Sequence, residues 1–350
     1  MAFVTYSDEQ DEWGYLRETT FGTAQIASSN FKKIKFPKGT KVELPVILSD
    51  LDLNKGTRQQ VNADLNLDRL SGPVRVLVGE FVLEQKQAAD LLFACLQNRV
   101  SQGAGAAFAK VFKYNLSQPA FSDSPAASAA FWFTLAWKSP ISGNGILITS
   151  CIVKELTISW DKTSTGAANL VKVSNMVIVG KKYADDQTLS GTWVDPGTSY
   201  YNAWDFTFKH ADTTAIPIRS CSIKMDNGAE PLDKDTDGTP KSFFLNFPKG
   251  GQTAEFKTWH YADTVASGTT DLIDNFSEGT EKNFSIISSI AVGTAGNLKF
   301  NWYGKITAGP PAEAENRQLI IPITMQMGHN SVTTNNALIV DIADSDDQDV

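Results

Sequence analysis

The stretch that decides the fold is Leu298-Lys299-Phe300-Asn301-Trp302-Tyr303, in which large apolar side chains alternate with polar ones. A period of two places every second side chain on the same face of an extended strand. The alternation recurs in residues 131–137, 171–179, 204–209 and 319–327. We expect such strands to bury one face in a core and to present the other to water or to a neighbour. The sequence therefore predicts a mainly β protein.

Helical periodicity is clear in one place, Val82–Asn98, where one face collects Ala88, Leu91, Leu92, Cys95 and Leu96. A second, shorter helix is predicted over Thr270–Phe276. The pattern favours a β-sandwich or barrel with a helix packed on its flank.

Two segments echo one another and suggest a duplicated module. Asn169-Leu170 leads into a strand that ends at Gly180-Lys181, and Asn297-Leu298 leads into one that ends at Gly304-Lys305. Between the halves the sequence becomes rich in turn-forming residues. We predict an N-terminal arm (1–30), a first β domain (31–185), a linker (186–200), a second β domain (201–340) and an acidic disordered tail (341–350).

The charge of the chain argues against tight binding to nucleic acid. The net charge is −8, and five aspartates of residues 341–350 account for much of it, leaving −3 elsewhere. A protein that grips phosphates needs a basic stripe. The three cysteines lie in apolar stretches and are expected to be buried thiols. No signal peptide or membrane span is predicted.

No motif for catalysis or cofactor binding is found, so we predict a protein that is not an enzyme and has no cofactor. The three histidines lack a nearby second ligand. The closest approach to a metal motif is a weak calcium-loop candidate, Asp233, Asp235 and Asp237, which lacks the bidentate glutamate at the twelfth position. Its alternative is an acidic hairpin tip.

The eight tryptophans allow an alternative interpretation, in which some of them form a carbohydrate-binding face. Trp137, Trp204 and Trp302 are in register with other apolar residues of their strands, which favours core packing. Trp13 and Trp193 lie in turn-rich segments and are expected to be freer.

The N-terminal stretch Trp13-Gly14-Tyr15-Leu16-Arg17-Glu18-Thr19-Thr20-Phe21-Gly22-Thr23-Ala24 resembles the opening of the major tail tube proteins of long-tailed, siphovirus-like bacteriophages. The order of the helix at 82–98, the strand Ser150–Ile158, the strand ending at Gly180-Lys181 and the late Ile321-Pro322-Ile323 is similar to that family. The acidic tail and the loop at 225–242 have no match in it.

The resemblance implies β-sandwich or barrel modules, each with a flanking helix, that form stacked rings around a channel for DNA. Two tube modules in one chain imply trimeric rings with pseudo-sixfold symmetry, whereas one module with a decorating domain implies hexameric rings. It also implies tape-measure, tail-tip and tail-terminator proteins as partners, passage of phage DNA without specific binding, and location in the virion tail after assembly in the host cytoplasm.

Candidate contacts between subunits or rings follow from the N-terminal motif and the basic cluster behind it. They are Trp13, Arg17, Glu18, Phe21, Lys32, Lys33 and Lys35. We expect the acidic loop with Asp233, Asp235 and Asp237 to face the lumen or a neighbouring ring. The alternatives are another structural virion protein, such as a tail terminator or a capsid decoration protein, or a carbohydrate-binding β-sandwich.

Overall fold

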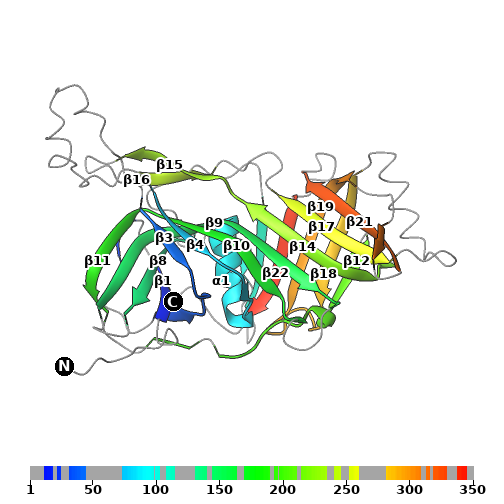
Figure 1. Ribbon diagram of the computed structural model, residues 1–350, viewed down its shortest axis with the longest axis horizontal. Coiled ribbons are helices and arrows are strands. Elements are labelled where there is room, and N and C mark those ends of the chain that lie inside the picture. Colours follow the sequence, from blue (N-terminus) through cyan, green and yellow to red (C-terminus); the bar gives the residue numbers. More distant parts are fainter. Residues whose placement is uncertain are drawn as a thin grey trace.

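A computed structural model describes most of the chain (Figure 1). The described residues are 12–18, 22–24, 31–44, 73–97, 99–102, 108–114, 131–139, 144–163, 169–189, 193–195, 197–210, 214–234, 240–245, 252–259, 281–308, 313–315, 318–328 and 337–344. Most of them lie in antiparallel strands, which confirms the mainly β fold. The predicted helix at Thr270–Phe276 lies outside the described residues.

The first group of strands, here called the N-terminal sheet, has the order β2-β1-β8-β9-β11. Its bounds are β1 (Glu12–Arg17), β2 (Lys32–Ile34), β8 (Phe133–Lys138), β9 (Asn144–Asp161) and β11 (Lys182–Thr188). Strand β9 is 18 residues long, and only its first half belongs to this sheet. Its second half crosses into the sheet that faces the first.

This opposing group, here called the long sheet, has the order β3-β4-β10-β9-β14-β17-β21-β20. Its further members are β3 (Lys41–Glu43), β4 (Val74–Val78), β10 (Lys172–Gly180), β14 (Ile218–Asp226), β17 (Thr253–Trp259), β21 (Gln318–Met327) and β20 (Glu313–Glu315). The short β5 (Phe81–Val82) also pairs with β10. The long sheet therefore contains strands from both halves of the chain.

The C-terminal strands continue from β21 through β19 (Leu298–Ala308), which pairs with both β18 (Glu281–Ser288) and β22 (Leu338–Asp344). Strand β18 pairs with β12 (Phe206–His210), and β12 with β13 (Thr214–Ala215). Strand β22 pairs with β7 (Phe108–Tyr114), and β7 with β6 (Arg99–Gln102). A separate pair joins β15 (Ala229–Lys234) and β16 (Pro240–Leu245).

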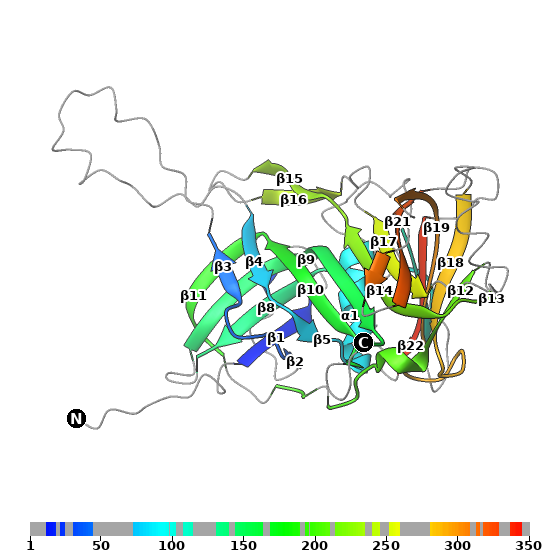
Figure 2. The ribbon, with the colours of Figure 1, turned by 45° about the vertical axis from the view of Figure 1, so that its right-hand side comes forward.

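The predicted helix at 82–98 is confirmed as α1 (Gln85–Leu96). Its predicted apolar face is buried, but so are all residues from Gln87 to Leu96. A helix buried on every side lies inside a protein rather than on a flank. Figures 1 and 2 show the reason, since α1 lies between the strands of the two halves, and it contacts β9, β14, β7 and β22.

A bulge in β10 interrupts the alternation predicted for residues 171–179. The register against β9 shifts between Ser174 and Val177, and Asn175 has a positive φ of 51°. The extra residue reverses the alternation, so Met176 and Ile178 are buried while Val177 is only partly buried.

Pairing between strands joins the two halves across the predicted domain boundary. Strand β14 continues the sheet of β9, and β7 extends the sheet of β22. The domain limits and the duplication stay predictions. Both glycines of the repeated Gly-Lys pairs lie at close approaches, Gly180 against Ile148 and Cys151, and Gly304 against the backbone of Gln326. No helix among the described residues is both long and apolar enough to span a membrane.

Candidate functional site

Glu18 of the N-terminal motif lies inside the protein and organises the segment around it. Its carboxylate accepts hydrogen bonds from Thr134 Oγ1, from the backbone N–H of Ser150 and from Ser150 Oγ, each at 2.7 Å. Ser150 Oγ in turn accepts from the backbone N–H of Gly22 at 2.6 Å. Burial raises the pKa of Glu18, although these hydrogen bonds act to lower it. The motif residue Glu18 thus ties the chain after β1 to β8 and β9.

The neighbouring motif residues also have contacts within the chain. The guanidinium of Arg17 lies 5.6 Å from the ring centroid of Phe93 and 5.4 Å from that of Phe131. Trp13 is partly buried and lies 5.6 Å from the ring of Phe36. Phe21 lies outside the described residues. These contacts do not test whether the motif also touches another subunit, which stays a prediction.

Three lysines of the basic cluster, Lys32, Lys33 and Lys35, each have an acidic partner in the same chain. Lys32 Nζ lies 3.4 Å from Asp90, whose carboxylate also accepts a hydrogen bond from Tyr15 at 2.7 Å. Lys33 pairs with Glu12 at 2.7 Å. The third pair, between Lys35 Nζ and Glu84 at 3.1 Å, lies at the start of α1. Part of the charge of this cluster is therefore satisfied internally.

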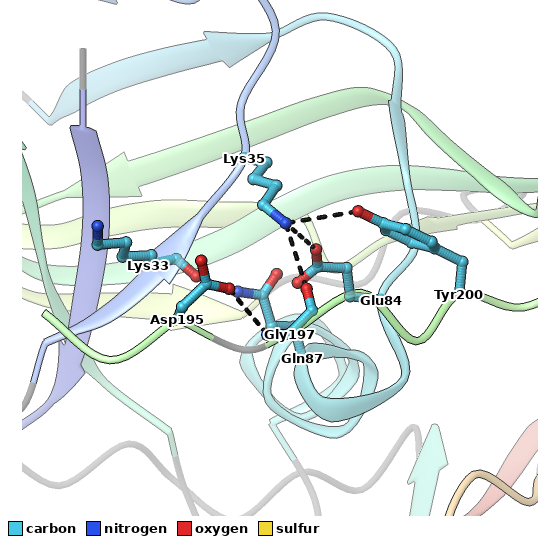
Figure 3. A network of polar contacts seen from close by, with 7 residues as sticks. All are labelled: Lys33, Lys35, Glu84, Gln87, Asp195, Gly197 and Tyr200. Carbon is cyan, nitrogen blue, oxygen red and sulfur yellow. Dashed lines mark hydrogen bonds and ion pairs between the residues drawn. The ribbon is translucent and has the colours of Figure 1, made fainter. Parts of the chain in front are cut away.

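Figure 3 shows the network around Lys35, which fastens residues 193–195 and 197–200 to β2 and α1. Lys35 Nζ also donates to the carbonyl oxygen of Gly197 at 3.2 Å and to the hydroxyl of Tyr200 at 3.4 Å. Backbone bonds join Lys33 to Val194 and Gln85 to Ser199. We call residues 193–200, without the undescribed residue 196, the strap. Most of the described residues of the predicted linker are thus held by hydrogen bonds.

The charges in this network oppose one another. Burial raises the pKa of Glu84 even though Lys35 acts to lower it. Burial acts to lower the pKa of Lys35, but its hydrogen bonds and attraction to Glu84 and Tyr200 outweigh that effect and raise it. The side chain of Glu84 is only 5% exposed, so we regard burial as the dominant influence on its carboxylate.

The outward face of the long sheet is polar across both halves of the chain. One row of directly opposed residues runs across five strands: Lys172, Ser159, Ser222, Glu255 and Thr324. The adjacent row, on the other face, is apolar and buried: Val173, Ile158, Ile223, Ala254 and Met325. Residues of the polar row line a shallow hollow of about 390 Å³.

Two lysines on this face lie beside carboxylates. Lys172 Nζ lies 2.6 Å from Glu80, and Lys224 Nζ lies 2.9 Å from Glu155. A surface built from small hydroxyl side chains and neutralised pairs offers little attraction to phosphate.

Several strands that border the long sheet are edge strands, although the sheet also continues from β21 into β19. Within the part of the chain that the structure describes, β3 pairs only with β4, and β20 pairs only with β21. In the N-terminal sheet, β11 likewise has a single partner, β9. An edge strand presents backbone N–H and C=O groups that can pair with another chain.

The predicted calcium-loop and lumen-facing aspartates fall largely outside the described part of the chain. Asp235 and Asp237 lie outside the described residues, as does the side chain of Asp233. Over the described ranges, no cluster of His, Cys, Asp and Glu could hold a metal ion. The three cysteines are buried, and burial raises the pKa of each thiol.

The polar partners Glu84, Asp90 and Tyr200 were missed by the sequence reasoning. Asp90 had a usable signal, because it is the one charged residue in the otherwise apolar run 88–96. Tyr200, by contrast, lies in a turn-rich stretch with no pattern. A scan against protein-family models and a search of curated proteins found no match to this chain.

Proposed function

We propose that this chain is a structural subunit that assembles with its own copies into stacked rings and forms the hollow tail tube of a long-tailed bacteriophage. The observation that carries the proposal is the long sheet, which runs unbroken from the edge strand β3 to β21 through both halves of the chain and has a second edge strand, β20, beside β21. Figure 1 shows β3 and β21, near the two ends of this sheet, on opposite sides of α1.

Pairing of β3 of one copy with β20 of the next would satisfy the edge groups of both strands. Such a contact is heterologous, because it joins two different surfaces, and repeating it closes a ring when the rotation fits. A closed barrel has no edges left to aggregate. Two tube modules per chain would give a trimeric ring with pseudo-sixfold symmetry, and a single module would give a hexameric ring.

The polar face of the long sheet supports its use as the channel wall. Two of its lysines, Lys172 and Lys224, are paired with carboxylates at 2.6 and 2.9 Å, so DNA would gain little from releasing counterions at these two positions. DNA could then pass without specific binding. Tape-measure, tail-tip and tail-terminator proteins are the partners that such a tube requires, and the assembled protein belongs to the virion tail.

Electron microscopy of the purified chain over a concentration series tests this function. We expect rings or tubes with a central channel, and rotational averaging of end views distinguishes trimeric from hexameric rings. A chain that stays monomeric at high concentration, or that forms solid particles without a channel, would contradict the proposal.

Hydrogen exchange tests the specific edge pairing in the same samples. Amides of β3 and β20 should exchange more slowly in the assembled form than in the monomer, because they gain partners. Amides of β14 serve as a matched control, since β14 already pairs on both sides. If the amides of β3 exchange equally slowly in the monomer and in the assembled form, the contact between copies does not involve β3.

A further inference from the structure

The strands of the C-terminal half curl round but leave a groove between β12 and β14. Phe208 O accepts a hydrogen bond from the backbone N–H of Ile216, and Phe206 O accepts one from Lys162 Nζ. No strand pairing between β12 and β14 occurs among the described residues. The resulting space, here called the β12–β14 groove, has a volume of about 480 Å³ and an apolar lining formed by Trp204, Phe206, Ala215, Ile216, Pro217 and Ile218.

Trp204 at this groove is 58% exposed, which contradicts its predicted place in the core. The reason is local, because Trp204 lies in the 3-10 turn η4 (Ala203–Asp205), and Asn202 Oδ1 accepts a hydrogen bond from its backbone N–H at 3.0 Å. The turn breaks the alternation before Phe206. By contrast, Trp193 and Trp302 are buried, so core packing is confirmed for Trp302 and the expected freedom of Trp193 is wrong.

An exposed tryptophan beside an apolar groove fits the anchor of a protein contact. Tryptophan is enriched among the residues that carry most of the energy of interfaces. The carbonyl groups of Phe206 and Phe208 are already used, so an occupant would bind through its side chains more than by adding a strand.

The charged side chains that line the groove are basic, Lys162 and Arg219. Burial lowers the pKa of Lys162, and nearby Asp205 only partly opposes this effect. A carboxylate of an incoming segment would favour the charged form of Lys162. The groove thus suits a segment that has apolar side chains followed by acidic ones.

We propose that the β12–β14 groove binds the N-terminal segment, residues 1–11, of a neighbouring copy, an inference that rests on the proposed self-assembly. This segment begins Met-Ala-Phe-Val-Thr-Tyr and continues Ser-Asp-Glu-Gln-Asp. The acidic segment at the other end, 345–350, offers the charge but only Val350 as an apolar residue, so it fits the groove less well.

The positions of the two surfaces favour a contact between copies. Segment 1–11 joins β1, whereas the groove borders β12 on the other side of α1 (Figure 1). Fully extended, eleven residues span at most about 40 Å. A link from one end of a subunit to the opposite end of the next is heterologous and therefore repeats along an assembly.

Cross-linking tests this contact in the full-length chain. One preparation carries Ser7→Cys and a second carries Thr207→Cys, because Thr207 lines the groove and is exposed. The native cysteines are at most 2% exposed and should not react. After co-assembly, a flexible bis-maleimide should join the two preparations. The matched position control replaces Thr207→Cys by Val194→Cys, at a residue that is 53% exposed on the strap.

Truncation of the anchor tests the same contact independently. Adding Trp204→Ala should reduce the Ser7–Thr207 cross-link, and should raise the concentration needed for assembly, about tenfold or more. Val194→Ala should change neither. Circular dichroism should remain that of the wild type, because Trp204 is mostly exposed.

The outcomes separate this inference from the proposed function. Two results would overturn the groove contact but not the proposed tube function. In the first, tubes form normally without the Ser7–Thr207 cross-link. In the second, the cross-link forms equally well at Val194. Failure of the wild type to assemble at all would overturn both proposals.

Discussion

Glu18 and Ser150 are joined twice, by the backbone N–H and by the hydroxyl of Ser150, both donating to the Glu18 carboxylate at 2.7 Å. Ser150 has a positive φ of 51°, a conformation that costs energy in most residues. The two hydrogen bonds help to hold it. A conspicuous acidic residue of the N-terminal motif is therefore a structural support of β9.

Replacing Glu18 with Ala should destabilise the protein by about 2–4 kcal/mol, because three donors lose their acceptor in a buried place. Urea unfolding of the monomer measures the effect. Glu43→Ala is the control, since Glu43 is exposed in β3 and should change stability by less than about 0.5 kcal/mol. Equal midpoints for the two variants would contradict the structural role of Glu18.

The pH dependence of the free energy of unfolding should differ between the wild type and Glu18→Gln, and the direction of the difference follows from the pKa of Glu18. Because the folded pKa of Glu18 is raised, the folded state keeps the proton after the unfolded state has released it. As pH rises from the unfolded pKa, about 4.3, through the folded pKa, the wild type loses stability relative to Glu18→Gln. The free energies of unfolding at about pH 4 and about pH 7 measure this. A constant difference between the two proteins would rule out the raised pKa.

Lys35→Met should loosen the strap. It leaves the carboxylate of Glu84 buried without its cation, and it removes the bonds to Gly197 and Tyr200. The expected cost is about 1–2 kcal/mol, below that of a fully buried pair because Lys35 is half exposed. Amide exchange of residues 197–200 should accelerate. Lys41→Met, at an exposed position of β3, is the control, and matching exchange rates in the two variants would refute the prediction.

Gly180→Ala and Gly304→Ala should each destabilise the protein by about 1–3 kcal/mol, through overpacking. A Cβ at Gly180 would overlap Ile148 and one at Gly304 would overlap the backbone of Gln326, whereas Gly328 has open space around it. Thermal unfolding of these variants beside Gly328→Ala measures the difference. If the unfolding midpoints of all three variants match that of the wild type, lack of space for a Cβ is not the reason for glycine at positions 180 and 304.

The sequence by itself determined the strands and the helix, because their periodicity expresses which side chains must leave water. The alternation of Leu298, Phe300 and Trp302 appears unchanged as buried residues of β19. Helix α1 begins and ends within three residues of its predicted limits. Local patterns of this kind depend only on neighbours in the chain.

Tertiary structure alone decided where the alternation breaks and which distant residues meet. The bulge at Asn175 and the turn at Trp204 reverse the face of single residues, and neither has a periodic signature. The pairing of Ser159 with Ser222, and of Lys35 with Glu84, joins residues far apart in the chain. Such contacts depend on how the strands stack around α1, and that arrangement is a property of the whole chain that no local stretch encodes.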